Sequence, residues 1–163
     1  MHGTNTRGVT LIEVLLVIGF MAILGGIGVT NFVNLRRANE FDGAVKIFLS
    51  YLRSTQQRAI SQDQSLKWGV RVNVPDPGQD FYSIFSCNSN CSATTITDMV
   101  YLNPDFQFTT PAQGSVSQDI IFATQTGLPE NGATTIVIGR VSDPATTKTI
   151  TISAQGLIEL VAS

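Results

Sequence analysis

Arg7-Gly8-Val9-Thr10-Leu11-Ile12-Glu13 is the stretch that decides the fold, because every residue after it from Val14 to Leu35 is uncharged. As a helix, that uncharged run measures about 33 Å at 1.5 Å per residue, close to the roughly 30 Å of hydrocarbon in a bilayer. A secretory signal peptide is cut after its apolar core. Here the candidate processing residue, Gly8, precedes the apolar run. Cleavage would therefore remove a polar leader, residues 1–8, and leave a transmembrane helix at 9–35 on the mature chain.

Glu13 is the charged side chain at the edge of this apolar helix. A carboxylate costs about 2.5–3.5 kcal/mol at the bilayer centre and less near the interface, so it is expected to have a partner. The alternative is that Glu13 lies at the level of the lipid headgroups and is solvated. Glycines in the run either loosen the helix where subunits pack or are simply exposed to lipid. They are Gly19, Gly25, Gly26 and Gly28.

Composition limits the rest of the chain to one ordinary domain. Of 163 residues, an apolar helix leaves roughly a hundred for the globular part. The formal net charge of −2 creates no field that by itself attracts nucleic acid or an anionic membrane. The single histidine, His2, lies in the leader, which excludes histidine-based catalysis from the mature chain. We expect no enzyme activity and no cofactor.

The carboxylates of the globular part show no paired spacing of the kind that acid–base catalysis uses. We interpret nearly all of them as solvated surface groups. They are Asp63, Asp80, Asp98, Asp119, Glu130 and Glu159.

An amphipathic helix is predicted to continue the apolar one to about Gln62. Its apolar residues recur at spacings of three and four, which places them on one face. They are Phe41, Ala44, Val45, Phe48, Leu52, Ala59 and Ile60. We therefore predict one long helix from about Val9 to about Gln62, whose second half buries this stripe against the globular domain at 36–163.

After Ser65 the hydrophobic period changes to alternation, which predicts strands separated by turns. Pro75-Asp76-Pro77-Gly78 is the turn of a first hairpin, and Ser142-Asp143-Pro144 is a later turn. One helix followed by many short strands predicts an α+β fold, with the helix laid on an antiparallel sheet. The strands are expected at 66–74, 81–85, 99–102, 106–109, 118–123, 134–141, 148–153 and 157–161.

Gly8-Val9-Thr10-Leu11-Ile12-Glu13 resembles the class III signal of type IV pilins and type II secretion pseudopilins. The resemblance implies that a prepilin peptidase cuts after Gly8 and methylates the new N-terminal residue, Val9. It also implies that Glu13 pairs with the N-terminal amine of a neighbouring subunit during assembly. The sequence departs from the family at Val9, where most members have Phe.

The C-terminal strands and the end of the helix resemble the GspH/FimT branch of minor pilins and pseudopilins. The segments that carry this likeness are 52–60, 120–127, 134–138, 149–153 and 156–158. The branch implies a minor subunit at the filament tip, held in the inner membrane with its globular domain in the periplasm or outside. The partners implied are the prepilin peptidase, other pilin or pseudopilin subunits and an inner-membrane assembly platform.

Cys87 and Cys91 bracket three residues, and export would place them where disulfides persist. A bridge would close the short loop after the second strand. A metal site would need further ligands that the sequence lacks, so no metal is expected.

DNA capture is the alternative function. It requires basic side chains that converge on one exposed face, and Trp68 would be a stacking group among them. The candidates are Lys67, Arg71, Arg140 and Lys148. Without Arg7, the mature chain has nine basic and twelve acidic residues, so these four are better interpreted as the polar side of ordinary strands.

Overall fold

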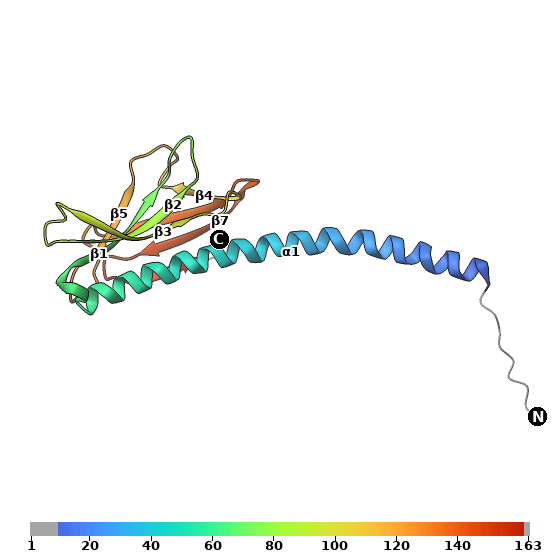
Figure 1. The fold of residues 1–163 in the computed structure, drawn as a ribbon, viewed down its shortest axis with the longest axis horizontal. Coiled ribbons are helices and arrows are strands. Elements are labelled where there is room, and N and C mark those ends of the chain that lie inside the picture. Colours follow the sequence, from blue (N-terminus) through green and yellow to red (C-terminus); the bar gives the residue numbers. More distant parts are fainter. Residues whose placement is uncertain (1–9, 162–163) are drawn as a thin grey trace, which may run out of the picture. The chain divides into compact units, whose positions relative to one another are not determined.

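The computed structural model describes residues 10–161, and within them it leaves out the side chains of residues 25–32 and 34. One helix, α1 (Leu11–Ile60), occupies the first part of the chain (Figure 1). The chain divides into two compact units between Glu40 and Phe41. The expected long helix is confirmed within the described residues. It ends where Gln62, with φ 57°, turns the backbone into the left-handed region ahead of a short 3₁₀ helix, Asp63–Ser65.

The second unit contains two four-stranded antiparallel sheets, and Figure 1 labels most of their strands. The first sheet has the order β3-β2-β1-β5, and the second has the order β4-β6-β7-β8. The strands of the first sheet are β1 (Lys67–Asn73), β2 (Phe81–Cys87), β3 (Thr94–Tyr101) and β5 (Gln118–Phe122). Those of the second are β4 (Phe106–Thr110), β6 (Thr134–Arg140), β7 (Asp143–Ile152) and β8 (Ile158–Val161).

The α+β class, with the helix packed on antiparallel strands, is confirmed. The structure adds that these strands form two sheets. Alternation in a sequence shows which side chains share a face, and it does not show which strands pair. A difference lies at 142–144, where a turn was expected: β7 already begins at Asp143, which pairs with Arg140 after a register shift. The turn between β6 and β7 is therefore tighter than the Ser142-Asp143-Pro144 pattern suggested.

The second half of α1 packs on both sheets through aromatic side chains. The ring of Phe48 lies 4.8 Å from that of Tyr82 in β2 and 5.5 Å from that of Phe108 in β4. About two turns earlier, Phe41 lies 5.2 Å from Phe106. The predicted apolar stripe is buried at Phe41, Val45, Phe48, Leu52 and Ala59. Because the same stripe contacts both sheets, the helix holds the two sheets to one core.

The polar residues at the end of α1 bind the loops between strands. Arg53 Nη2 donates to the carbonyl of Ile158 at 3.1 Å. Gln56 Nε2 donates to the carbonyls of Gly127 at 2.9 Å and Gly156 at 2.7 Å. These bonds satisfy backbone acceptors in two loops far apart in sequence. They fix the last turns of the helix to the C-terminal half of the domain.

Candidate functional site

Glu13 lies in the first turn of α1, and its side chain is exposed. The backbone N–H of Glu13 donates to the carbonyl of Thr10 at 3.1 Å, which starts the helix. A carboxylate at this position is stabilised by the partial positive charge of the helix N-terminus. Gly8 and Val9 lie outside the described residues. The pairing of Glu13 with an N-terminal amine therefore stays a prediction.

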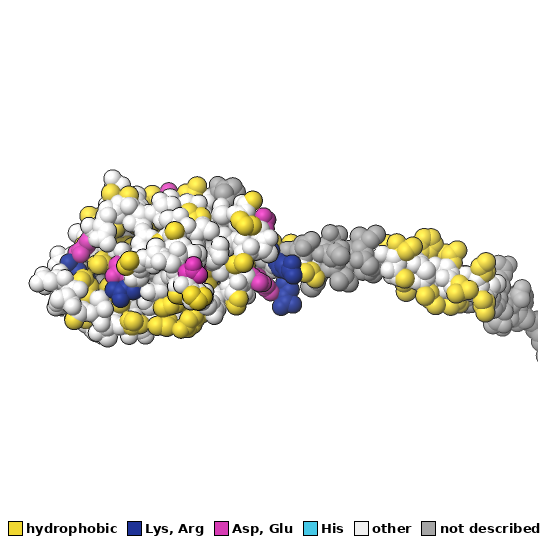
Figure 2. Space-filling view, turned by 90° about the horizontal axis from the view of Figure 1, so that it is seen from above, with side chains coloured by type: hydrophobic (Ala, Val, Ile, Leu, Met, Phe, Trp, Pro, Cys, Tyr) yellow, Lys and Arg dark blue, Asp and Glu magenta, His cyan; other side chains and the backbone are white. Residues whose placement is uncertain are grey.

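The first unit exposes a continuous series of large apolar side chains. Leu11 is 79% exposed and Leu24 is 69% exposed, and the apolar side chains between them are at least 46% exposed. Figure 2 shows hydrophobic side chains gathered on part of the described surface of this unit. Among the residues with described side chains, no stretch of helix combines the length and hydropathy needed to span a bilayer.

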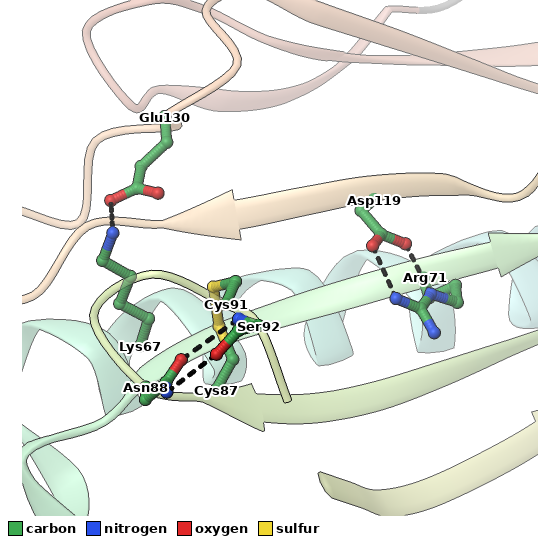
Figure 3. The surroundings of a disulfide bond; sticks show 8 residues. All are labelled: Lys67, Arg71, Cys87, Asn88, Cys91, Ser92, Asp119 and Glu130. Carbon is green, nitrogen blue, oxygen red and sulfur yellow. Dashed lines mark hydrogen bonds and ion pairs between the residues drawn. A yellow bond between two sulfur atoms is a disulfide. The ribbon is translucent and has the colours of Figure 1, made fainter. Parts of the chain in front are cut away.

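Two of the four candidate DNA-contacting cations lie in β1 and form ion pairs (Figure 3). Lys67 Nζ contacts Glu130 Oε1 at 2.5 Å. The guanidinium of Arg71 donates two hydrogen bonds to Asp119, at 2.6 and 2.7 Å, and lies over the ring of Phe85. These bonds to Asp119 are the main cause of a raised pKa for Arg71. Glu130 and Asp119 are therefore ion-pair partners and not solvated surface groups as expected.

Trp68 does not have the role suggested by the sequence. Its side chain is only 3% exposed, and its indole N–H donates to the carbonyl of Asp63 at 3.1 Å. The guanidinium of Arg58 lies 4.9 Å from the ring centroid. The prediction of an exposed stacking group is wrong, because Trp68 alternates with Lys67 on β1 and so faces the core.

The other two candidate cations lie in the second sheet. Lys148 in β7 contacts Asp42 of α1 at 3.5 Å. Arg140 ends β6, opposite Phe106 of β4. On the face shown in Figure 2, basic side chains are scattered singly beside acidic ones. Three of the four candidates, Lys67, Arg71 and Lys148, are therefore paired with carboxylates.

The Sγ atoms of Cys87 and Cys91 are joined in a disulfide, with the two Cα atoms 4.8 Å apart. Cys87 ends β2, and the loop between the cysteines is closed by hydrogen bonds of Asn88 (Figure 3). The Asn88 carbonyl accepts from the Cys91 N–H at 3.0 Å, and its side chain bonds Ser92 at 3.1 and 3.2 Å. Within the described residues, no group of three or more His, Cys, Asp or Glu could hold a metal ion.

The architecture resembles that of a solved pilin. The type IV minor pilin FimU of Pseudomonas aeruginosa superposes with a TM-score of 0.51 over 74% of this chain and 92% of that chain, at 16% sequence identity. The chain has a pilin-like fold. No protein-family model matches the sequence, and no curated protein matches it. At this identity the likeness establishes the fold, and the function has to be argued from the residues.

A buried carboxylate of this pilin-like chain was not anticipated from the sequence. Asp80, expected at the surface, is 4% exposed and lies directly before β2. Its Oδ2 accepts hydrogen bonds from the Phe108 N–H at 2.6 Å and from Gln113 Nε2 at 2.7 Å. No local pattern in the sequence could have signalled this burial, since both donors are about thirty residues away along the chain.

Proposed function

We propose that this chain is a minor pilin or pseudopilin, a structural subunit of a type IV pilus or a type II secretion pseudopilus. The observation that carries the proposal is the sequence from Gly8 to Glu13 in front of the uncharged run 14–35, in a chain whose globular part has a pilin-like fold. We expect the subunit to lie at the filament tip. Its partners are a prepilin peptidase, other pilin or pseudopilin subunits and an inner-membrane assembly platform.

The proposed maturation begins at the leader. Prepilin peptidase removes residues 1–8 after Gly8 and methylates the amine of Val9. The helix 9–35 then holds the subunit in the inner membrane, with residues 36–163 in the periplasm or outside. The absence of charged side chains from Val14 to Leu35 supports this location, because charged groups at the bilayer centre are costly.

Assembly moves the N-terminal helix from lipid into the apolar core of the filament. The exposed apolar side chains of α1 from Leu11 to Leu24 supply the surface that is buried there. Glu13 pairs with the N-terminal ammonium of a neighbouring subunit. In an apolar surrounding this attraction is much stronger than in water, and it offsets part of the cost of burying each charge. The pair therefore sets the register between subunits.

The test replaces Glu13 with glutamine, which keeps the shape of the side chain and removes its charge. Glu13→Gln is expected to accumulate in the membrane fraction like the wild type. It is expected to be depleted, by roughly tenfold or more, from filaments sheared from cells that carry the assembly machine, since the lost pair is worth several kcal/mol in the filament core. Immunoblots of both fractions measure the ratio.

Glu159→Gln is the matched control, because Glu159 is an exposed carboxylate in β8 and its loss changes the net charge equally. It should enter filaments like the wild type. Normal incorporation of Glu13→Gln would overturn the role of Glu13 as the assembly charge. The DNA-capturing alternative is not favoured, because Lys67, Arg71 and Lys148 already pair with carboxylates.

A further inference from the structure

A cavity of about 250 Å³ opens on the second unit, at the end of the domain where the β1–β2 turn meets the loops around β4. Asp80 forms part of its wall, together with apolar groups and three glutamines. The apolar groups come from Pro104, Phe106 and Val141, and the glutamines are Gln79, Gln107 and Gln113. The cavity therefore combines a buried carboxylate with an apolar side.

Two of the three glutamines on this wall already use their amide groups as hydrogen-bond donors. Gln113 Nε2 donates to Asp80 Oδ2 at 2.7 Å and to the carbonyl of Phe108 at 2.9 Å. Gln79 Nε2 donates to the carbonyl of Leu102. Gln113 keeps its acceptor oxygen, and Gln79 keeps its acceptor oxygen and one N–H. The described contacts give no donor to Asp80 Oδ1. A glutamine has one acceptor oxygen with two lone pairs, and a carboxylate accepts only.

The wall of the cavity carries the negative charge of Asp80. No basic side chain is among the described residues that line the cavity. Arg140 lies opposite Phe106 in the β4–β6 register but is not part of the lining, and no described ion pair includes it. Asp80, 4% exposed, is therefore a carboxylate with two neutral donors on one oxygen and open acceptor capacity on the other.

We propose that this cavity binds an aliphatic ammonium or guanidinium group, with the cation at Asp80 and its hydrocarbon stem against Phe106, Pro104 and Val141. A cation satisfies a buried carboxylate with charge-assisted hydrogen bonds, and lysine and arginine side chains pack their stems on apolar surface while the charged head finds its partner. The volume accommodates one such side chain. The site goes beyond the assembly role of the N-terminal helix and does not depend on it.

The test uses the full chain in detergent micelles, labelled with ¹⁵N at phenylalanine only. The amide of Phe108 reports directly, because it donates to Asp80. The probes are Nα-acetyl-arginine N-methylamide, the lysine counterpart, and the citrulline counterpart as the neutral isostere. Putrescine is the fourth probe and represents a free amine. The expected result is a saturable shift of the Phe108 amide with the cationic probes and none with citrulline.

Three variants make the result specific to the cavity. Asp80→Asn removes the charge and should weaken binding by about tenfold or more. Gln107→Lys leaves the hydrogen bonds of Asp80 in place and supplies a tethered ammonium that should prevent the probes from binding. This variant tests the cation site even if Asp80→Asn fails to fold. Asp105→Asn is the matched control, because Asp105 lies in the neighbouring turn and does not line the cavity. It should bind like the wild type.

The relative response to the probes identifies the source of the cation. Tighter binding of the amino-acid derivatives supports a lysine or arginine side chain of a protein partner, and tighter binding of putrescine supports a free amine. Equal shifts with arginine and citrulline derivatives, no saturable shift in the wild type, or equal loss in Asp105→Asn would each overturn the proposal.

Discussion

Gly69 lies in β1 at a position where a side chain has no room. A Cβ built there would be 2.6 Å from Cζ of Phe85 and 2.8 Å from the backbone carbonyl oxygen of Ile120. Phe85 can lie across β1 only because this residue is glycine, and its ring then supports the guanidinium of Arg71. Gly43 in α1 is the opposite case, since a Cβ there would meet nothing within 4 Å.

These two glycines give a paired prediction. Gly69→Ala should lower the free energy of unfolding by about 1–3 kcal/mol, because the added methyl group overpacks a filled site. Gly43→Ala should raise it by about 0.5–1 kcal/mol, because alanine is the better helix former. Urea unfolding followed by the fluorescence of Trp68, the single tryptophan, measures both. Equal midpoints for the two variants would contradict the described packing around Gly69.

At the scale of elements, α1 and β2 meet through two tyrosines. The rings of Tyr51 and Tyr82 are 5.5 Å apart and nearly perpendicular. Burial, together with the charges of Tyr51 and Asp98, raises the pKa of the Tyr82 hydroxyl. Burial and the nearby Asp98 carboxylate of β3 also raise the pKa of Tyr51. Ionising either tyrosine therefore opposes the packing of the helix on the first sheet.

The stability of the globular unit should fall in alkaline solution. Because the folded pKa of Tyr82 lies above the ordinary value of 10.0, the unfolded chain releases this proton first. The stability due to the neutral tyrosine is complete below about pH 10 and is lost as pH rises above it, by at most about 1.4 kcal/mol per pH unit per tyrosine. Urea unfolding at pH 7 and at several values above 10 measures the slope.

Tyr82→Phe should make that alkaline slope shallower, because phenylalanine keeps the ring contacts with Phe48 and Tyr51 and has no proton to lose. The free energy of unfolding of Tyr82→Phe at pH 7, compared with that of the wild type, shows whether the phenylalanine ring fits at this position. A slope equal to that of the wild type would contradict the assignment to Tyr82.

At the scale of the whole molecule, the leader and the apolar helix predict one processed form. The chain extracted from membranes of cells that contain prepilin peptidase should have the intact mass of residues 9–163 plus one methyl group. Gly8→Asp should leave the complete chain, since Gly8 is the residue expected before the cut. Gly3→Asp, a glycine elsewhere in the leader, should be processed normally. A mass that begins after the apolar run would instead indicate an ordinary signal peptide.

The sequence by itself determined the helix and most strand positions of this protein. The apolar run, the three-and-four spacing that follows it and the later alternation are local properties, and each corresponds to a described element. The short spacing of Cys87 and Cys91 also kept them within reach of each other. The resemblance of residues 8–13 to the pilin signal is likewise local, and it concerns residues that mostly lie outside the described part.

Only the tertiary structure decided how these elements combine. It divided the strands into two sheets, paired Arg71 with Asp119 across 48 positions and buried Trp68 and Asp80. Each outcome depends on strand register and on contacts between distant segments, which the period of a sequence does not specify. Three of the four basic residues that seemed available for DNA, Lys67, Arg71 and Lys148, were paired for this reason. The cavity at Asp80 arose where four connections between strands meet.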